Sequence, residues 1–293
     1  MKTIAILTDI HGNHPALQAA LQDIATKQIE HIYCLGDVVG IGPDSNQVLE
    51  QLTTRSDVSF IMGNHDLAVI AAARNEPVPV GHHNEREHHE WLAKRIEPKY
   101  IELMSEWPMS LTTSILQNEL LFCHYHLDYK NWFAPIDKLP TTEALEQIYS
   151  KTDYKLVCFG HHHIVHHFES DTRLYFNPGS LGCYDKPYAR YGIVTVSEKE
   201  ITAGVQLVPY NNINFLRSYE ELQVPDREFI LKVFHGGQYL CGSELLEPAG
   251  VASQLLRRSC RTNMEFHGTN WTIWSGIEVP RICAFLSRLG TPS

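Results

Sequence analysis

The sequence predicts an α/β protein in which helices cover both faces of a β-sheet that is partly parallel and partly antiparallel. Short apolar runs alternate with segments of helical periodicity near the start of the chain. Further along, residues 191–196 and 201–208 are rich in β-forming side chains, with few helix signals between them. The 293 residues are 43% hydrophobic and 20% charged, which is sufficient for one large core.

Three strand and loop units open the chain, and a helix follows each of the first two. Residues 4–7, 32–35 and 58–62 are apolar runs that predict buried strands. Residues 17–24 carry apolar side chains at i, i+3, i+4 and i+7, and residues 45–52 show a similar pattern behind a serine that can cap a helix. Repeated units of this kind place successive strands in parallel.

The middle of the chain is more varied. Residues 75–90 are polar and broken by prolines, and we expect a surface excursion there that could cap a site. A helix is expected through residues 91–103, followed by a hairpin within 111–123 and a helix near 141–150.

The carboxyl-terminal part begins with an apolar strand at residues 156–159. A second strand runs into the turn-forming residues 177–180, and a helical pattern covers 213–235. We expect one domain over residues 1–237, followed by an extension of unknown role over residues 238–293.

Charge and cysteine usage exclude several classes of protein. The formal net charge of −10 argues against general binding to a nucleic-acid backbone, which needs a basic surface. No apolar stretch approaches the roughly 20 residues of a membrane helix. Seven cysteines form no C-x-x-C pair, and their odd number favours reduced thiols. The first residues run directly into a strand without a signal-peptide pattern, so we expect a cytoplasmic protein.

Polar side chains follow the apolar runs, and parallel strands would bring them to one edge of the sheet. These residues are Asp9, His11, Asp37, Asn64, His65, His124, His161 and His163. Two carboxylates, an amide oxygen and several imidazoles are too many ligands for one tetrahedral ion. They suit two divalent metals that share a bridging carboxylate.

The tract Gly160-His161-His162-His163 directly follows an apolar strand. Alternate side chains of a strand point to the same face, so a continuing strand would aim His161 and His163 at one site and His162 away from it.

Five motifs in order make the sequence resemble the calcineurin-like metallophosphoesterase superfamily: D-x-H, G-D-x-x-G, G-N-H-D/E, a lone histidine and G-H-x-H. The branch it looks like is the small bacterial phosphodiesterases, some of which cleave diadenosine polyphosphates. The resemblance implies a layered β-sandwich of mixed sheets flanked by helices. It also implies a hydrolase acting on a small phosphorylated substrate such as a nucleotide or dinucleoside polyphosphate.

The resemblance also implies roles for individual residues. One metal would be held by Asp9, His11 and His163, and the second by Asn64, His124 and His161, with Asp37 bridging both. A water or hydroxide between the metals would be the in-line nucleophile. Manganese is the expected metal, and iron, cobalt, nickel or zinc would also suit these ligands.

His65 corresponds to the histidine of the family that binds no metal, and it would assist catalysis. Asp66 would accept a hydrogen bond from that imidazole and orient it.

Three points stay open at this stage. Either His124 or His126 could be the lone ligand, and we favour His124 because it ends the strand. We expect His82, His83, His88, His89, His166 and His167 to be solvated loop histidines. A scaffold protein with this fold and a protein serine/threonine phosphatase are the alternative functions, and a complete ligand set disfavours the scaffold.

Overall fold

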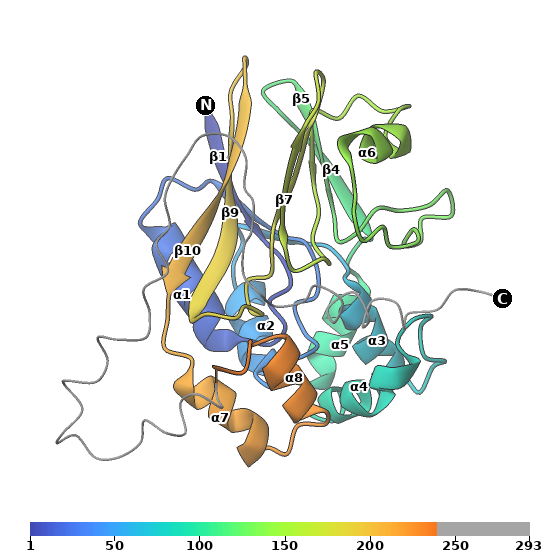
Figure 1. The fold of residues 1–293 in the computed structure, drawn as a ribbon, viewed down its shortest axis with the longest axis vertical. Coiled ribbons are helices and arrows are strands. Elements are labelled where there is room, and N and C mark those ends of the chain that lie inside the picture. Colours follow the sequence, from blue (N-terminus) through green and yellow to red (C-terminus); the bar gives the residue numbers. More distant parts are fainter. Residues whose placement is uncertain (239–293) are drawn as a thin grey trace.

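The computed structural model describes residues 1–238, and within them two five-stranded sheets pack face to face with helices on the outside (Figure 1). One apolar cluster fills the space between the sheets. Two others lie between the outer face of each sheet and its helices. This arrangement confirms the predicted layered sandwich of mixed sheets flanked by helices. The expectation of a sheet with helices on both faces was wrong, because the inner face of each sheet packs on the other sheet.

The first sheet has the strand order β10-β9-β1-β2-β3. Its strands are β1 (Lys2–Leu7), β2 (His31–Cys34), β3 (Val58–Phe60), β9 (Tyr188–Val196) and β10 (Ile201–Pro209). The strands β1, β2 and β3 are parallel, and β9 joins β1 in the antiparallel direction. The carboxyl ends of the three parallel strands therefore lie at the same edge.

The second sheet has the order β4-β5-β6-β8-β7. Its strands are β4 (Ser110–Ile115), β5 (Asn118–Cys123), β6 (Leu156–Cys158), β7 (Val165–Glu169) and β8 (Leu174–Pro178). The strands β5, β6 and β8 are parallel, and the outer strands pair antiparallel to them. The sequence did not predict β7, whose histidines we had expected in a loop.

Eight α-helices of the described residues lie outside the two sheets (Figure 1). They are α1 (His14–Ala25), α2 (Ser45–Thr53), α3 (Asn64–Ala73), α4 (Arg86–Ala93), α5 (Pro98–Ser105), α6 (Thr142–Ile148), α7 (Ile213–Glu221) and α8 (Arg227–Val233). The first five contribute to the cluster against the first sheet, and α6 packs on the second. The last two form a separate apolar cluster with residues of neighbouring loops.

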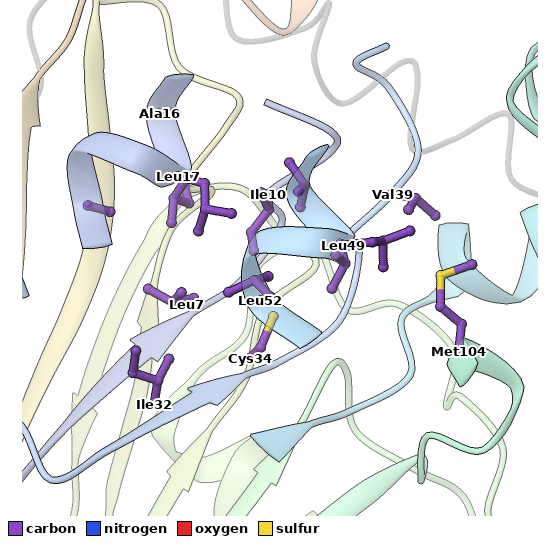
Figure 2. Packing of buried hydrophobic residues seen from close by; sticks show 14 of the residues in the cluster. Leu7, Ile10, Ala16, Leu17, Ile32, Cys34, Val39, Leu49, Leu52 and Met104 are labelled. Carbon is purple, nitrogen blue, oxygen red and sulfur yellow. The ribbon is translucent and has the colours of Figure 1, made fainter. Parts of the chain in front are cut away.

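The alternation of side chains along β1 explains why two layers meet there. Ile4 and Ile6 lie in the cluster between the sheets, whereas Ala5 and Leu7 lie in the cluster under the helices. Figure 2 shows Leu7 on this helix-facing side, together with side chains from α1 and α2 such as Leu17. A strand buried on both faces accounts for the continuous apolar run in the sequence.

Two details of the middle region differ from the sequence-based expectation. The predicted helix through residues 91–103 is two helices, because the residue before Pro98 disfavours helical backbone angles and ends the continuous pattern. The surface excursion expected at residues 75–90 ends early: a short 3₁₀ helix (His83–Glu85) leads directly into α4.

The cysteines of the described residues are reduced, and they lie in the core. Cys34, Cys123, Cys158 and Cys183 are buried free thiols, as expected, and the other three cysteines lie outside the described residues. A helix that is both long and apolar enough to span a membrane is absent from residues 1–238. The predicted extension lies, from residue 239 onward, outside the part of the chain that the structure describes.

The two sheets are joined by a stacked aromatic pair, and we expect its loss to be costly. The rings of Tyr33 on β2 and Phe122 on β5 are parallel within 5°, with their centroids 3.9 Å apart. Phe122→Ala should lower the free energy of unfolding by about 3–5 kcal/mol, since it opens a cavity between the sheets. Leu207→Ala on the exposed side of β10 is the control and should change it by less than about 0.5 kcal/mol. Equal losses in denaturant titrations of the two variants would contradict a shared core between the sheets.

Candidate metal centre

The predicted polar residues meet at the edge where the parallel strands of both sheets end. Asp9, Asp37 and Asn64 follow β1, β2 and β3, and His124 follows β5. The backbone N–H of Asp9 donates to the carbonyl of Gly36, so the first two loops lie side by side. The sheet topology alone thus brings together side chains that are far apart in the sequence.

The first group of donors contains Asp9, His11, Asp37 and His163. The Nε2 atoms of His11 and His163 are 2.9 Å apart. His163 Nε2 lies 3.3 Å from Asp9 Oδ1, and His11 Nε2 lies 3.7 Å from Asp37 Oδ2. Carboxylate and imidazole atoms at these separations can share one cation.

The second group contains Asp37, Asn64, His124 and His161. The amide oxygen of Asn64 lies 2.8 Å from His124 Nε2 and 2.7 Å from His161 Nδ1. Asp37 Oδ2 lies 3.3 Å from the same nitrogen of His124. Asp37 therefore belongs to both groups.

The hydrogen bonding of Asp9 supports a cation at this position. Its Oδ2 atom accepts from the Thr8 hydroxyl at 2.7 Å and from the backbone N–H of His161 at 3.0 Å. Its Oδ1 atom is buried without a hydrogen-bond partner, although it faces two imidazoles. A buried carboxylate oxygen is costly unless something positive binds it, so the residues fit a divalent metal.

The backbone adopts a left-handed conformation at five of the seven donors. Asp9, His11, Asp37, His161 and His163 all have positive φ, between 50° and 68°. This conformation costs roughly 1–2 kcal/mol for a residue with a side chain and concentrates at functional sites. The strand β6 ends at Cys158, so left-handed turns, and not strand alternation, direct the two histidines inward. The two histidines do reach one site, but the expected cause, strand alternation, was wrong.

A set of buried polar contacts holds the histidine turn in place. The Arg190 guanidinium donates to the carbonyl of His163 at 2.6 Å, and the Asn177 amide donates to the carbonyl of Gly160 at 2.7 Å. At Gly160 a Cβ atom would lie 2.0 Å from the Thr8 hydroxyl, so only glycine allows this approach. The sequence offered only the turn composition near residue 177 as a signal for this support.

The electrostatics of the centre keep both of its carboxylates ionised. Burial raises the pKa of Asp37, but His124 and His11 outweigh it and lower the value to about 2. Burial lowers the pKa of His124, whereas Asp37 and Asp9 raise it more strongly, to about 9. Burial also raises the pKa of Asp9, and the charge of the nearby His163 reverses this and holds it well below its usual range. The two carboxylates stay ionised and draw positive charge into the site.

The structure distinguishes between the two candidates for the lone histidine. His124 faces Asn64 and Asp37. His126 is buried in the opposite direction, where its Nδ1 atom lies 2.8 Å from the Tyr149 hydroxyl. The geometry therefore agrees with the choice of His124.

The role expected for Asp66 needs correction. Both of its carboxylate oxygens accept backbone N–H groups, from Val39 at 3.1 Å and from Gly63 at 3.0 Å. The imidazole of His65 instead has His89 as its partner, with Nδ1 and Nε2 3.0 Å apart. Asp66 thus holds the start of α3, which carries Asn64 and His65, and does not orient the ring directly.

Four of the six histidines expected in solvated loops are buried. His82 lies beside the centre, and His88 and His89 lie on the buried face of α4. His166 is also buried, on β7, whereas His83 and His167 are exposed as expected. The spacing of four residues between Glu85 and His89 is typical of one helix face and could have indicated their proximity. The nearby prolines favoured a surface excursion instead.

The fold and the buried acidic and imidazole donors define a metal-dependent hydrolase. The calcineurin-like phosphoesterase superfamily domain matches residues 1–199, and the chain belongs to this superfamily. The family implies bound divalent metal ions, and the residues described above fit them. The expectation of a hydrolase is thereby confirmed.

Several known proteins are similar to the chain. An uncharacterized protein from Methanocaldococcus jannaschii is 24% identical over 237 residues, covering 75% of this chain and 91% of that protein. A symmetrical bis(5'-nucleosyl)-tetraphosphatase from Delftia acidovorans is 37% identical, but over 68 residues, or 24% of its length. The fold of a Pyrococcus horikoshii hypothetical protein matches with a TM-score of 0.68 and 21% identity, covering 81% of this chain and 99% of that one. A metallophosphoesterase from Sphaerobacter thermophilus matches with a TM-score of 0.60 and 20% identity, covering 78% and 97%.

The structural role of Asp66 can be tested by removing one acceptor. Asp66→Asn should lower the free energy of unfolding by about 1–3 kcal/mol, since an amide nitrogen cannot accept the backbone N–H that one carboxylate oxygen accepts. Asp171→Asn on the exposed surface is the matched control and should have little effect. Thermal and denaturant unfolding measure both. Unchanged stability combined with lost turnover would show that Asp66 acts on the His65 ring after all.

Proposed function

We propose that this protein is a dinuclear-metal phosphohydrolase that cleaves phosphodiester or phosphoanhydride bonds of small phosphorylated substrates, in particular of nucleotides. The observation that carries this proposal is the position of Asp37, whose Oδ2 atom lies 3.7 Å from His11 Nε2 and 3.3 Å from His124 Nε2. A carboxylate between two donor groups is the arrangement that lets two metals share one ligand.

The ligands divide between the two proposed ions. One ion would be held by Asp9, His11 and His163, the other by Asn64, His124 and His161, and Asp37 would contact both. When bound, the ions would supply Lewis acidity toward a phosphoryl oxygen and toward the attacking water. Manganese remains the expected metal, and iron, cobalt, nickel or zinc would suit the same donors.

The chain contributes a proton donor through His65. Its backbone N–H donates to Asp37 Oδ1 at 2.8 Å, which fixes the residue beside the shared carboxylate. Its ring packs edge-on against His11, with the centroids 5.1 Å apart. The ring would donate a hydrogen bond to a phosphoryl oxygen or protonate the leaving oxygen.

A pocket beside His65 supports a substrate with an organic group. It has a volume of about 270 Å³, and Ile41, Phe229, Ile230 and Phe234 form its apolar part. An aromatic and aliphatic wall suits the flat ring of a nucleobase better than an inorganic phosphate. The pocket includes residues of α8, which lies beyond the matched residues 1–199.

The substrate class is supported from two directions. The short matches to symmetrical bis(5'-nucleosyl)-tetraphosphatases suggest a dinucleoside polyphosphate. The excess of positive charge from two divalent ions over two carboxylates would attract such an anion despite the formal net charge of −10. The buried free thiols fit a reducing, cytoplasmic compartment.

The role of His65 gives the first test. His65→Asn should lower kcat on bis-p-nitrophenyl phosphate by about 10²- to 10⁴-fold, because the proton donor is lost while the metal ligands remain. Elemental analysis should find the same metal content as in the wild-type protein. His167→Asn makes the same change at an exposed site and should leave both quantities unaltered. Wild-type turnover of His65→Asn would remove its catalytic role, and metal-free protein without turnover would refute the hydrolase.

The pocket gives the second test. Phe229→Ala should raise KM for diadenosine tetraphosphate about 2- to 12-fold, the effect of losing about 0.5–1.5 kcal/mol of ring stacking. Its kcat should stay the same, because the contact would be made equally in the ground and transition states. Leu207→Ala, on β10, is the control for a general effect of losing an apolar side chain. An unchanged KM would place the nucleoside elsewhere.

A further inference from the structure

Four side chains form a cluster beside the candidate metal centre: His65, His82, Glu85 and His89, of which His82 and His89 are buried and the other two are partly buried. Three of its members come from the segment that the sequence analysis had assigned to a surface excursion. The three imidazole rings lie edge to face, with centroids between 5.0 and 5.3 Å apart. None of the family motifs quoted above includes His82, Glu85 or His89.

The hydrogen bonds of His82 have one consistent assignment. The Asn64 amide nitrogen lies 3.2 Å from His82 Nε2, and an amide nitrogen can only donate. The Nε2 atom of His82 must therefore accept, so the proton of this neutral ring is on Nδ1. That proton is donated to Glu85 Oε2 at 2.7 Å. The result is a chain of two hydrogen bonds from Asn64 through His82 to Glu85.

This chain determines which end of the Asn64 amide faces the metal centre. The amide nitrogen is held by His82, so the oxygen points at His124 and His161. A flipped amide would present N–H groups to those imidazoles and could not bind a cation. Ligands of this kind depend on outer partners that fix their orientation.

A similar argument applies to His65 and His89. The Nδ1 atom of His89 is buried and has no partner. If that atom carried the proton, a buried N–H would be unpaired, at a cost of about 1–3 kcal/mol. The proton of His89 therefore belongs on Nε2, where it is donated to His65 Nδ1 at 3.0 Å. His65 then carries its own proton on Nε2, the nitrogen that remains for the substrate.

We propose that His82, Glu85 and His89 are positioning residues, of which the first two hold the Asn64 amide with its oxygen toward the metals and the third keeps the proton of His65 on Nε2. This inference deepens the proposed hydrolase function and rests on it.

Three imidazoles and a carboxylate could also bind a metal ion of their own. The hydrogen bond from Asn64 argues against this, since a protonated Nδ1 of His82 has no lone pair for an ion.

The orientation of the Asn64 amide by His82 is tested by measuring metal affinity, which does not depend on turnover. His82→Phe keeps the ring volume but removes the acceptor, and it should weaken manganese binding about 10- to 100-fold in a chelator competition. His82→Gln should restore binding to within a few fold, because its amide oxygen can accept from Asn64. His31→Phe is the control, since His31 Nε2 makes a comparable contact, 2.8 Å from the Ser59 hydroxyl, at the start of β2 and so at the end of the strand opposite the centre.

The effect of His89 on His65 is tested by measuring turnover and by determining the tautomer of His65 directly. His89→Phe should lower kcat on bis-p-nitrophenyl phosphate at least about tenfold with unchanged manganese affinity, and His89→Gln, which keeps a donor, should recover most of it. Long-range ¹H–¹⁵N spectra of the wild-type imidazoles should show His65 protonated on Nε2.

The outcomes separate this inference from the proposed function. Wild-type manganese affinity in His82→Phe, or equal impairment of the Phe and Gln variants, would overturn the positioning role even in an active enzyme. A third metal equivalent in the wild-type protein that is absent from Glu85→Gln would overturn it in favour of an additional ion site. A wild-type protein that binds no metal and turns over nothing would refute the hydrolase proposal, whereas the tautomer of His65 would still be readable.

Discussion

The structure of the site depends on compensation of the negative charge of two buried carboxylates. Asp9 and Asp37 lie at the ends of neighbouring parallel strands, each almost inaccessible to water, and both are kept ionised by the imidazoles around them. Burying two like charges so close together is unfavourable unless cations bind between them. Left-handed backbone turns and the close approach of Gly160 to Thr8 bring the remaining donors to the same site.

Much of the fold follows from the periodicity of the sequence. The runs that became β1, β2 and β5 are apolar on both faces, and their burial between helices and a second sheet accounts for this. Because parallel strands end at one edge, the positions of Asp9, Asp37 and Asn64 also followed from the order of strands and helices. The hairpin of β4 and β5 and the pair β9 and β10 were recognisable from β-rich segments with few helix signals.

Other parts could not be predicted from local pattern. The inward direction of His161 and His163 depends on left-handed turns that are supported by Arg190 and Asn177, and these contacts are made across long stretches of chain. The burial of His82 and His89 results from packing against His65, which no periodicity in a proline-broken segment reveals. For Asp66, the motif indicates an acidic residue but not the direction in which its carboxylate points.

The central claim is that one carboxylate serves two metal ions. The most direct measurement is anomalous diffraction from crystals of the protein grown with manganese, recorded above and below the manganese absorption edge. The account predicts two anomalous peaks, one on each side of the Asp37 carboxylate, with Asn64 beside one and His163 beside the other. A single peak, or peaks that do not contact Asp37, would contradict it.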